Sequence, residues 1–210
     1  MAGDGIAASE RQALCDLLDA LGPDGPTLCE GWKTSDIAAH LFVRERRPQA
    51  TPGILLGGVL GSITTRSMSA ALRRYGYEGV VGKVRSGPPI LLRPVDELIN
   101  QLEYFVHTED VRRADPDWAP VDNPALDDAL WASLRRAARL FTRRLKGAGL
   151  ELVRPDGDSI VARSGAPRAV LTGGPQELAL FVLGRRSVAR VELSGSADAQ
   201  DAVRRSDFSA

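Results

Sequence analysis

Apolar residues recur at helical spacing over the first two thirds of the chain. Between Ala7 and about Leu145 they follow the three-to-four-residue period of an amphipathic helix, and no stretch shows the clean two-residue alternation of a half-buried strand. This spacing predicts four principal helices, over residues 7–21, 34–47, 93–113 and 123–145. Four helices with apolar stripes favour a helical bundle.

Residues at the ends of these segments set their bounds. The first helix should end at the Gly- and Pro-rich turn of residues 22–26. The second should begin with Thr34 as its N-cap and Asp36 in its first turn, where a negative charge meets the positive end of the helix dipole. Pro94 is typical of a first helical position in the third. Residues 54–67 are rich in Gly, Ser and Thr and predict a loop, followed by short helical pieces.

The pattern changes after Gly149. Residues 150–153 and 160–162 flank a Pro-Asp-Gly-Asp turn sequence and predict a β-hairpin. Two more strands are expected over residues 169–171 and 188–193, with helices over 174–184 and 197–205. The sequence therefore predicts a mainly α protein of two domains, a four-helix bundle over residues 1–148 and a small α+β domain over residues 149–210.

Composition excludes several classes of protein. The 27 basic and 27 acidic side chains cancel, so no net charge favours nucleic acid or an anionic membrane as a partner. The chain is 43% hydrophobic and 26% charged, as in ordinary globular proteins. Two cysteines form no disulfide framework, and the first ten residues lack the features of a secretory signal. We expect a cytoplasmic protein that is a monomer or homodimer.

Two histidines, His40 and His107, fall inside predicted bundle helices, and the sequence contains no others. Glu103 lies four residues before His107, so the carboxylate and imidazole share one helix face and could converge on one ion. Two His and one Glu would leave coordination positions open, as in a catalytic metal site. The alternative is a hydrogen-bonded core histidine on each helix with Glu103 as a surface charge. The spacing alone leaves both alternatives open.

Two runs of sequence resemble signatures of a known family. Residues 27–41, TLCEGWKTSDIAAHL, resemble the first signature of the mycothiol-dependent maleylpyruvate isomerase N-terminal domain, which belongs to the DinB-like superfamily of metal-binding four-helix bundles. Residues 97–114, which end in EYFVHTEDVRRA, match the second. The tail, with LTGGP at 171–175 and LGRR at 183–186, is similar to the family's small C-terminal domain. The chain looks closest to an actinobacterial branch known only as metal-binding proteins.

The resemblance implies a metal site and a reaction class. It assigns His40, Glu103 and His107 as ligands of one divalent ion. The family resemblance implies that this ion is zinc, and Ni, Fe or Mn would suit the same ligand atoms. It also implies that mycothiol or a similar thiol is activated there for transfer to, or isomerisation of, an electrophilic substrate. A non-catalytic metal-binding or metal-sensing protein is the alternative. The residue 52–67 loop is expected near the metal.

Other residues are weaker candidates for this chemistry. Arg44, one turn after His40, could hold a substrate carboxylate or could simply be a solvated residue at a helix end. Asp110 could hydrogen-bond a ligand imidazole or Arg113. Cys29 is interpreted as a buried small hydrophobic residue. Arg185 and Arg186 could contact the polar groups of a thiol cofactor, or be ordinary surface residues.

Overall fold

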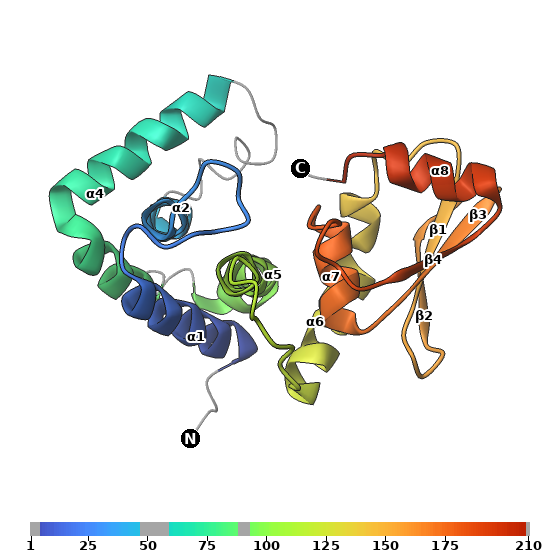
Figure 1. Cartoon of the computed structure of the whole chain (residues 1–210), viewed down its shortest axis with the longest axis horizontal. Helices are drawn as coiled ribbons and strands as arrows, with labels where there is room; N and C mark the ends of the chain where they lie inside the picture. The colour runs from blue at the N-terminus through green and yellow to red at the C-terminus, as the bar shows by residue number, and fades with distance from the viewer. Residues whose placement is uncertain (1–4, 47–58, 88–92, 209–210) are drawn as a thin grey trace. The chain divides into compact units, whose positions relative to one another are not determined.

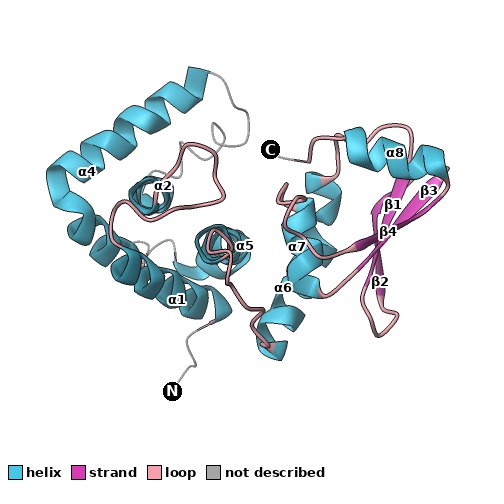
Figure 2. Cartoon of the chain, in the orientation of Figure 1, coloured by secondary structure: helices cyan, strands magenta, loops and turns pink. Residues whose placement is uncertain are grey.

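The computed structural model describes residues 5–46, 59–87 and 93–208. Contacts divide the chain into two compact units, Met1–Val121 and Asp122–Ala210. The first unit is helical and the second combines helices with a sheet (Figures 1 and 2). Within the described ranges, no helix combines the length and apolar character that a membrane span requires.

Among the described residues of the first unit there are four helices, the number that the sequence pattern predicts, but one of the four is a different segment of the chain. They are α1 (Ile6–Leu21), α2 (Thr34–Arg46), α4 (Val59–Arg85) and α5 (Arg93–Arg112). Helix α2 packs mainly on α4, and α1 packs mainly on α5. The unit is therefore a four-helix bundle in which α4 supplies the helix that the sequence pattern assigns to residues 123–145.

The ends of α1 and α2 follow local chemistry. Helix α1 ends at Gly22, whose φ of 72° suits glycine and breaks the helical path. At the start of α2 the Asp36 carboxylate accepts a hydrogen bond from the Lys33 backbone N–H at 2.9 Å. Thr34, predicted as the N-cap, is instead the first helical residue. Its hydroxyl accepts from the Gly25 N–H at 3.0 Å, which fastens the preceding turn to the helix.

Helix α4 corrects the predicted loop. Residues 54–58 lie outside the described residues, but residues 59–67 belong to α4, so the prediction of a loop is wrong there. Small and β-branched residues lower intrinsic helix propensity, but packing along α2 outweighs that preference. The short helical pieces expected after the loop belong to this helix, which is interrupted by a kink at Gly76, where φ is 67°.

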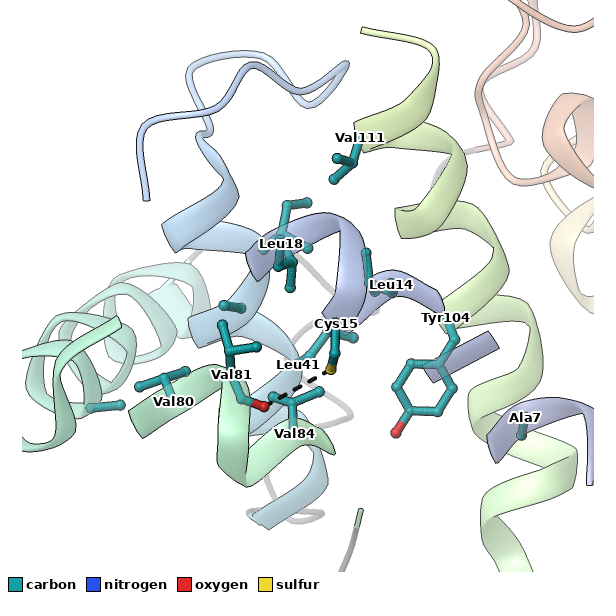
Figure 3. Close-up of a cluster of buried hydrophobic side chains, with 13 residues drawn as sticks. Ala7, Leu14, Cys15, Leu18, Leu41, Val80, Val81, Val84, Tyr104 and Val111 are labelled. Atoms are coloured by element: carbon teal, nitrogen blue, oxygen red, sulfur yellow. Dashed lines mark hydrogen bonds between the residues drawn. The ribbon is translucent and has the colours of Figure 1, made fainter. Parts of the chain in front are cut away.

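The bundle core draws on all four helices. Leu14, Cys15 and Leu18 of α1 meet Val81 of α4 and Tyr104 of α5 in one buried cluster (Figure 3). The Cys15 thiol lies 3.9 Å from the Val81 carbonyl oxygen, a weak contact drawn as the dashed line in Figure 3. Burial raises the pKa of Cys15 to about 12, so this thiol stays protonated and behaves as a small hydrophobic side chain.

The second unit contains a four-stranded sheet in the order β2-β1-β3-β4. Strands β1 and β2 form the predicted antiparallel hairpin, β3 runs parallel to β1, and β4 is antiparallel to β3. Strand β4 (Glu192–Gly195) is shorter than the strand predicted over residues 188–193 and begins further along the chain. The elements of this unit are α6 (Pro124–Phe141), β1 (Gly149–Val153), β2 (Ser159–Arg163), β3 (Arg168–Thr172), α7 (Pro175–Val182), β4 (Glu192–Gly195) and α8 (Ala197–Arg205).

Helix α6 belongs with the sheet. Its start is set by Asn123, whose side chain accepts from the Leu126 N–H at 3.1 Å. Along its length the Trp131 indole donates to Asp158 in the hairpin turn at 2.7 Å, and the Thr142 hydroxyl just beyond it reaches the Ala162 carbonyl of β2 at 2.8 Å. These contacts explain why the compact units divide before α6, whereas the change of sequence period suggests a boundary near Gly149.

A buried carboxyl group on α1 leads to a prediction about stability. Glu10 is 8% exposed, and its pKa is raised to about 7 by burial and by the nearby charge of Glu109, against the opposing effect of Arg112. The ordinary value is 4.5, so the folded state favours the protonated form and loses stability as pH rises from 4.5 through 7. At pH 8 the free energy of unfolding of the variant E10Q should therefore be about 2–3 kcal/mol higher than that of the wild type.

Chemical denaturation of both proteins at pH 8 and pH 5 measures this difference, which should shrink greatly at pH 5. The exposed Glu30, changed to Gln, is the matched control and should leave stability nearly unchanged at both values. An E10Q gain of equal size at both pH values would show that ionisation of Glu10 is not the cause.

Candidate metal centre

Helices α2 and α5 bring the three predicted ligands together. His40 comes from the middle of α2, and Glu103 and His107 lie one turn apart on α5, as the four-residue spacing requires. Glu103 Oε2 lies 3.9 Å from His40 Nε2 and 3.7 Å from His107 Nε2. The two imidazole rings meet edge to face with centroids 5.1 Å apart. Sixty-seven residues apart in sequence, the two histidines share one site.

The protonation of these groups suits cation binding. Both imidazoles are buried, with exposures of 6% for His40 and 5% for His107. Burial lowers the pKa of His40, so its ring is neutral at pH 7 and keeps a lone pair for a ligand. For Glu103 burial acts to raise the pKa, but the neighbouring His40 and the charge of Arg44 outweigh it and lower the pKa to about 2. The site therefore holds a carboxylate anion beside neutral nitrogen.

The spacing of the ligand atoms fits a small divalent ion. The three ligand atoms all lie within 4.8 Å of one another. A tetrahedral ion with bonds of about 2.1 Å needs ligand atoms about 3.4 Å apart, so His40, Glu103 and His107 would need to draw in only slightly. Neutral imidazole and carboxylate are donors that Zn, Fe, Ni and Mn accept. In the described residues no fourth ligand-type side chain joins this trio.

Arg44 is placed beside the trio and not in solvent. Its side chain is 9% exposed, and Nη1 lies 3.4 Å from Glu103 Oε2. The guanidinium thus neutralises the carboxylate that the two histidines also face. A cation bound at Glu103 would compete with Arg44 for the same oxygen and would free the guanidinium for another anion. A role in holding substrate stays a prediction.

Asp110 is placed against a predicted ligand. Its Oδ2 lies 3.0 Å from His107 Nδ1, the ring nitrogen that faces away from Glu103, and Asp110 is fully buried. The contact with a ligand imidazole, one of the two partners considered from sequence, is therefore present in the structure. Arg113 pairs with Glu109 at 2.6 Å.

Cys29, interpreted from the sequence as a buried small hydrophobic residue, instead makes a polar contact that sequence reasoning missed. It is half-buried, and its Sγ lies 3.2 Å from the same Asp110 Oδ2. The two residues are 81 positions apart, so no local spacing could have linked them. The centroid of the neighbouring Trp32 ring lies 5.3 Å from that of the His40 ring.

The two tail arginines make contacts inside the second unit. Arg186 stacks on Phe208 with 4.0 Å between the guanidinium carbon and the ring centroid, and it donates to the Val203 carbonyl at the end of α8 at 2.9 Å. Arg185 donates to the Leu183 carbonyl at 3.0 Å. These contacts give both side chains a structural role, and cofactor binding by them stays a prediction.

Comparison with known proteins bears on the fold. No family model matches the sequence, and no curated protein matches it. Two solved structures match, those of the mycothiol-dependent maleylpyruvate isomerase and of a histidine-to-alanine mutant of it, with TM-scores of 0.59 and 0.60. In both cases 91% of this chain and 92% of the other are covered at 17% identity. The resemblance inferred from the two signatures is thus confirmed at the level of architecture: the chain has a fold like that of the mycothiol-dependent maleylpyruvate isomerase.

Proposed function

We propose that the protein binds one divalent metal ion through His40, Glu103 and His107 and uses it to activate a small thiol for transfer or isomerisation chemistry. The observation that carries this proposal is the convergence of the only two histidines of the chain on one carboxylate. The structural neighbours support the choice of thiol, because the enzyme they represent is mycothiol-dependent. Zinc is the proposed ion, and a mycothiol-type thiol and an electrophilic small molecule are the proposed substrates.

The ligand count favours an enzyme over a structural metal site. Structural zinc sites are usually closed by four protein ligands, whereas catalytic sites keep a position for water or substrate. Three ligand-type side chains meet here among the described residues, so a small molecule would have access to the ion. When bound, the divalent ion supplies positive charge that lowers the pKa of a nearby thiol.

The residues around the proposed ion have distinct roles in this proposal. His40 and His107 would offer nitrogen atoms, and Glu103 would supply one negative charge, so a divalent site would keep net positive charge and favour an anionic sulfur. Arg44, whose guanidinium lies 3.4 Å from Glu103, would hold an acidic group of the substrate. Trp32 beside His40 shields the ligand set from water on that side.

Cobalt-substituted protein tests the proposal. The visible spectrum of the bound Co(II) should change on addition of mycothiol, with a sulfur-to-metal charge-transfer band that saturates at one thiol per chain. Glutathione serves as the comparison thiol and S-methylated mycothiol as the control that lacks a thiol. Mass spectrometry of reactions with electrophiles, with and without chelator, then identifies the product.

A cobalt spectrum that no thiol changes would contradict thiol activation at this site. Bound cobalt without any thiol response would instead support a metal-binding or metal-sensing protein without catalysis. Absence of bound cobalt would contradict both functions.

A further inference from the structure

A hydrogen-bonded chain of three side chains runs from a loop to one of the proposed metal ligands. The Cys29 thiol donates to Asp110 Oδ2 at 3.2 Å, and His107 Nδ1 lies 3.0 Å from the same oxygen. An ionised carboxylate can only accept hydrogen bonds, so both neighbours act as donors to it. Asp110 is fully buried, where a carboxylate oxygen without donors would be costly.

This arrangement fixes the chemical state of His107. A neutral imidazole carries one N–H, and the Asp110 carboxylate draws it to Nδ1. The lone pair is then on Nε2, the nitrogen that lies 3.7 Å from Glu103. The contact with Asp110 therefore selects the tautomer that can bind an ion beside Glu103 and His40, and it also orients the ring.

The loop that carries Cys29 is fastened in the place that this contact needs. The Leu28 N–H donates to the Asp110 carbonyl at 2.9 Å, which ties the loop to the end of α5. The Thr27 hydroxyl accepts from the Cys29 N–H at 3.2 Å and reaches the Trp32 carbonyl at 2.9 Å, which sets the local turn. The thiol is thus held against the carboxylate by bonds on both sides of it in the chain.

We propose that Cys29 is a positioning residue for the metal centre: its thiol holds the Asp110 carboxylate in the rotamer that orients His107. The inference rests on the proposed metal site and adds to it a residue that does not touch the ion. Cys29 is not assigned as the nucleophile of the reaction, because its thiol proton is donated to the Asp110 carboxylate.

Two substitutions of Cys29 separate this role from packing. In C29S a hydroxyl keeps the donor, whereas C29A removes it. The affinity of metal-free protein for Co(II), measured by competition with a chelator, should fall about tenfold in C29A and stay within a few-fold of the wild type in C29S. The buried Cys15, which lies in the bundle core, provides the control: C15A removes a thiol of the same kind and should leave cobalt affinity unchanged.

A second measurement is independent of metal. Because the chain has only two histidines, a long-range ¹H–¹⁵N spectrum of the metal-free protein contains two imidazole patterns, which H40Q assigns. Wild type and C29S should show His107 with its proton on Nδ1, and C29A should show a mixture of the two tautomers. This readout reports the hydrogen-bond chain even if the protein binds no cobalt, so failure of the metal site and failure of the positioning role give different results.

Two outcomes would overturn the role of Cys29. The first is a C29A protein with wild-type cobalt affinity and an unchanged His107 tautomer. The second concerns the atoms of Cys29, His107 and Asp110, which are close enough to hold an ion themselves. Binding of two cobalt ions by the wild type and one by C29A would make Cys29 a ligand and not a positioning residue.

Discussion

Protein in which both His40 and His107 are replaced by alanine should be purified essentially free of divalent metal, whereas the wild type should carry about one ion per chain. The two substitutions remove both nitrogen ligands and leave Glu103, and the sequence offers no other imidazole to take their place. A single carboxylate paired with Arg44 at 3.4 Å cannot hold a transition-metal ion against a chelator. Elemental analysis after dialysis against a weak chelator gives the stoichiometry.

A variant of Glu103 and a matched control test whether the metal depends on these particular side chains. E103Q keeps the shape of the side chain but removes its charge, and it should weaken metal binding by at least about tenfold. Its control is E78Q, an exposed carboxylate on α4 that should leave the stoichiometry at one. Circular dichroism of each metal-free variant shows whether the fold is retained. A folded double-alanine variant that still held one ion per chain would place the metal elsewhere.

The Glu103–His107 pair could be predicted from sequence because it depends on helical geometry alone. Residues four apart on a helix share a face, so once α5 is recognised the two side chains must lie close together. His40 is different, because its distance to Glu103 depends on how α2 packs against α5. The resemblance to a known family supplied that information, and the distance of 3.9 Å agrees with it.

The parts that sequence reasoning missed depend on tertiary contacts. The first turns of α4 are rich in residues of low helix propensity, so propensity alone does not predict the helix that the structure shows there. Helix α6 has the apolar stripe of a bundle helix, but the sheet serves as well as another helix to cover that stripe. Cys29 gains its partner Asp110 across 81 residues, and no periodic pattern records such a contact.

Among the substitutions considered, the largest loss of stability is expected from replacing a buried charged side chain at the end of α5. Glu109 and Arg113 have side-chain exposures of 2% each and are joined at 2.6 Å, and Glu109 also pairs with Arg112. The Arg113 guanidinium lies 4.1 Å from the Trp118 ring centroid, so it cannot turn outward without losing that contact. Removing the carboxylate would take the charge of Glu109 away from a buried cation.

E109Q should therefore lower the free energy of unfolding by about 3 kcal/mol, because breaking a buried ion pair on one side is much costlier than losing an exposed one. Denaturant unfolding at pH 7, followed by circular dichroism and tryptophan fluorescence, measures the change. The matched control is D24N, which removes the partner of Lys33 from an exposed pair in the same unit and should change stability by less than about 1 kcal/mol. Restoring charge balance in a second step, with R113M added to E109Q, should recover part of the loss, since a buried apolar side chain needs no counter-charge. Equal stability of E109Q and D24N would mean that water reaches Arg113 in place of the carboxylate.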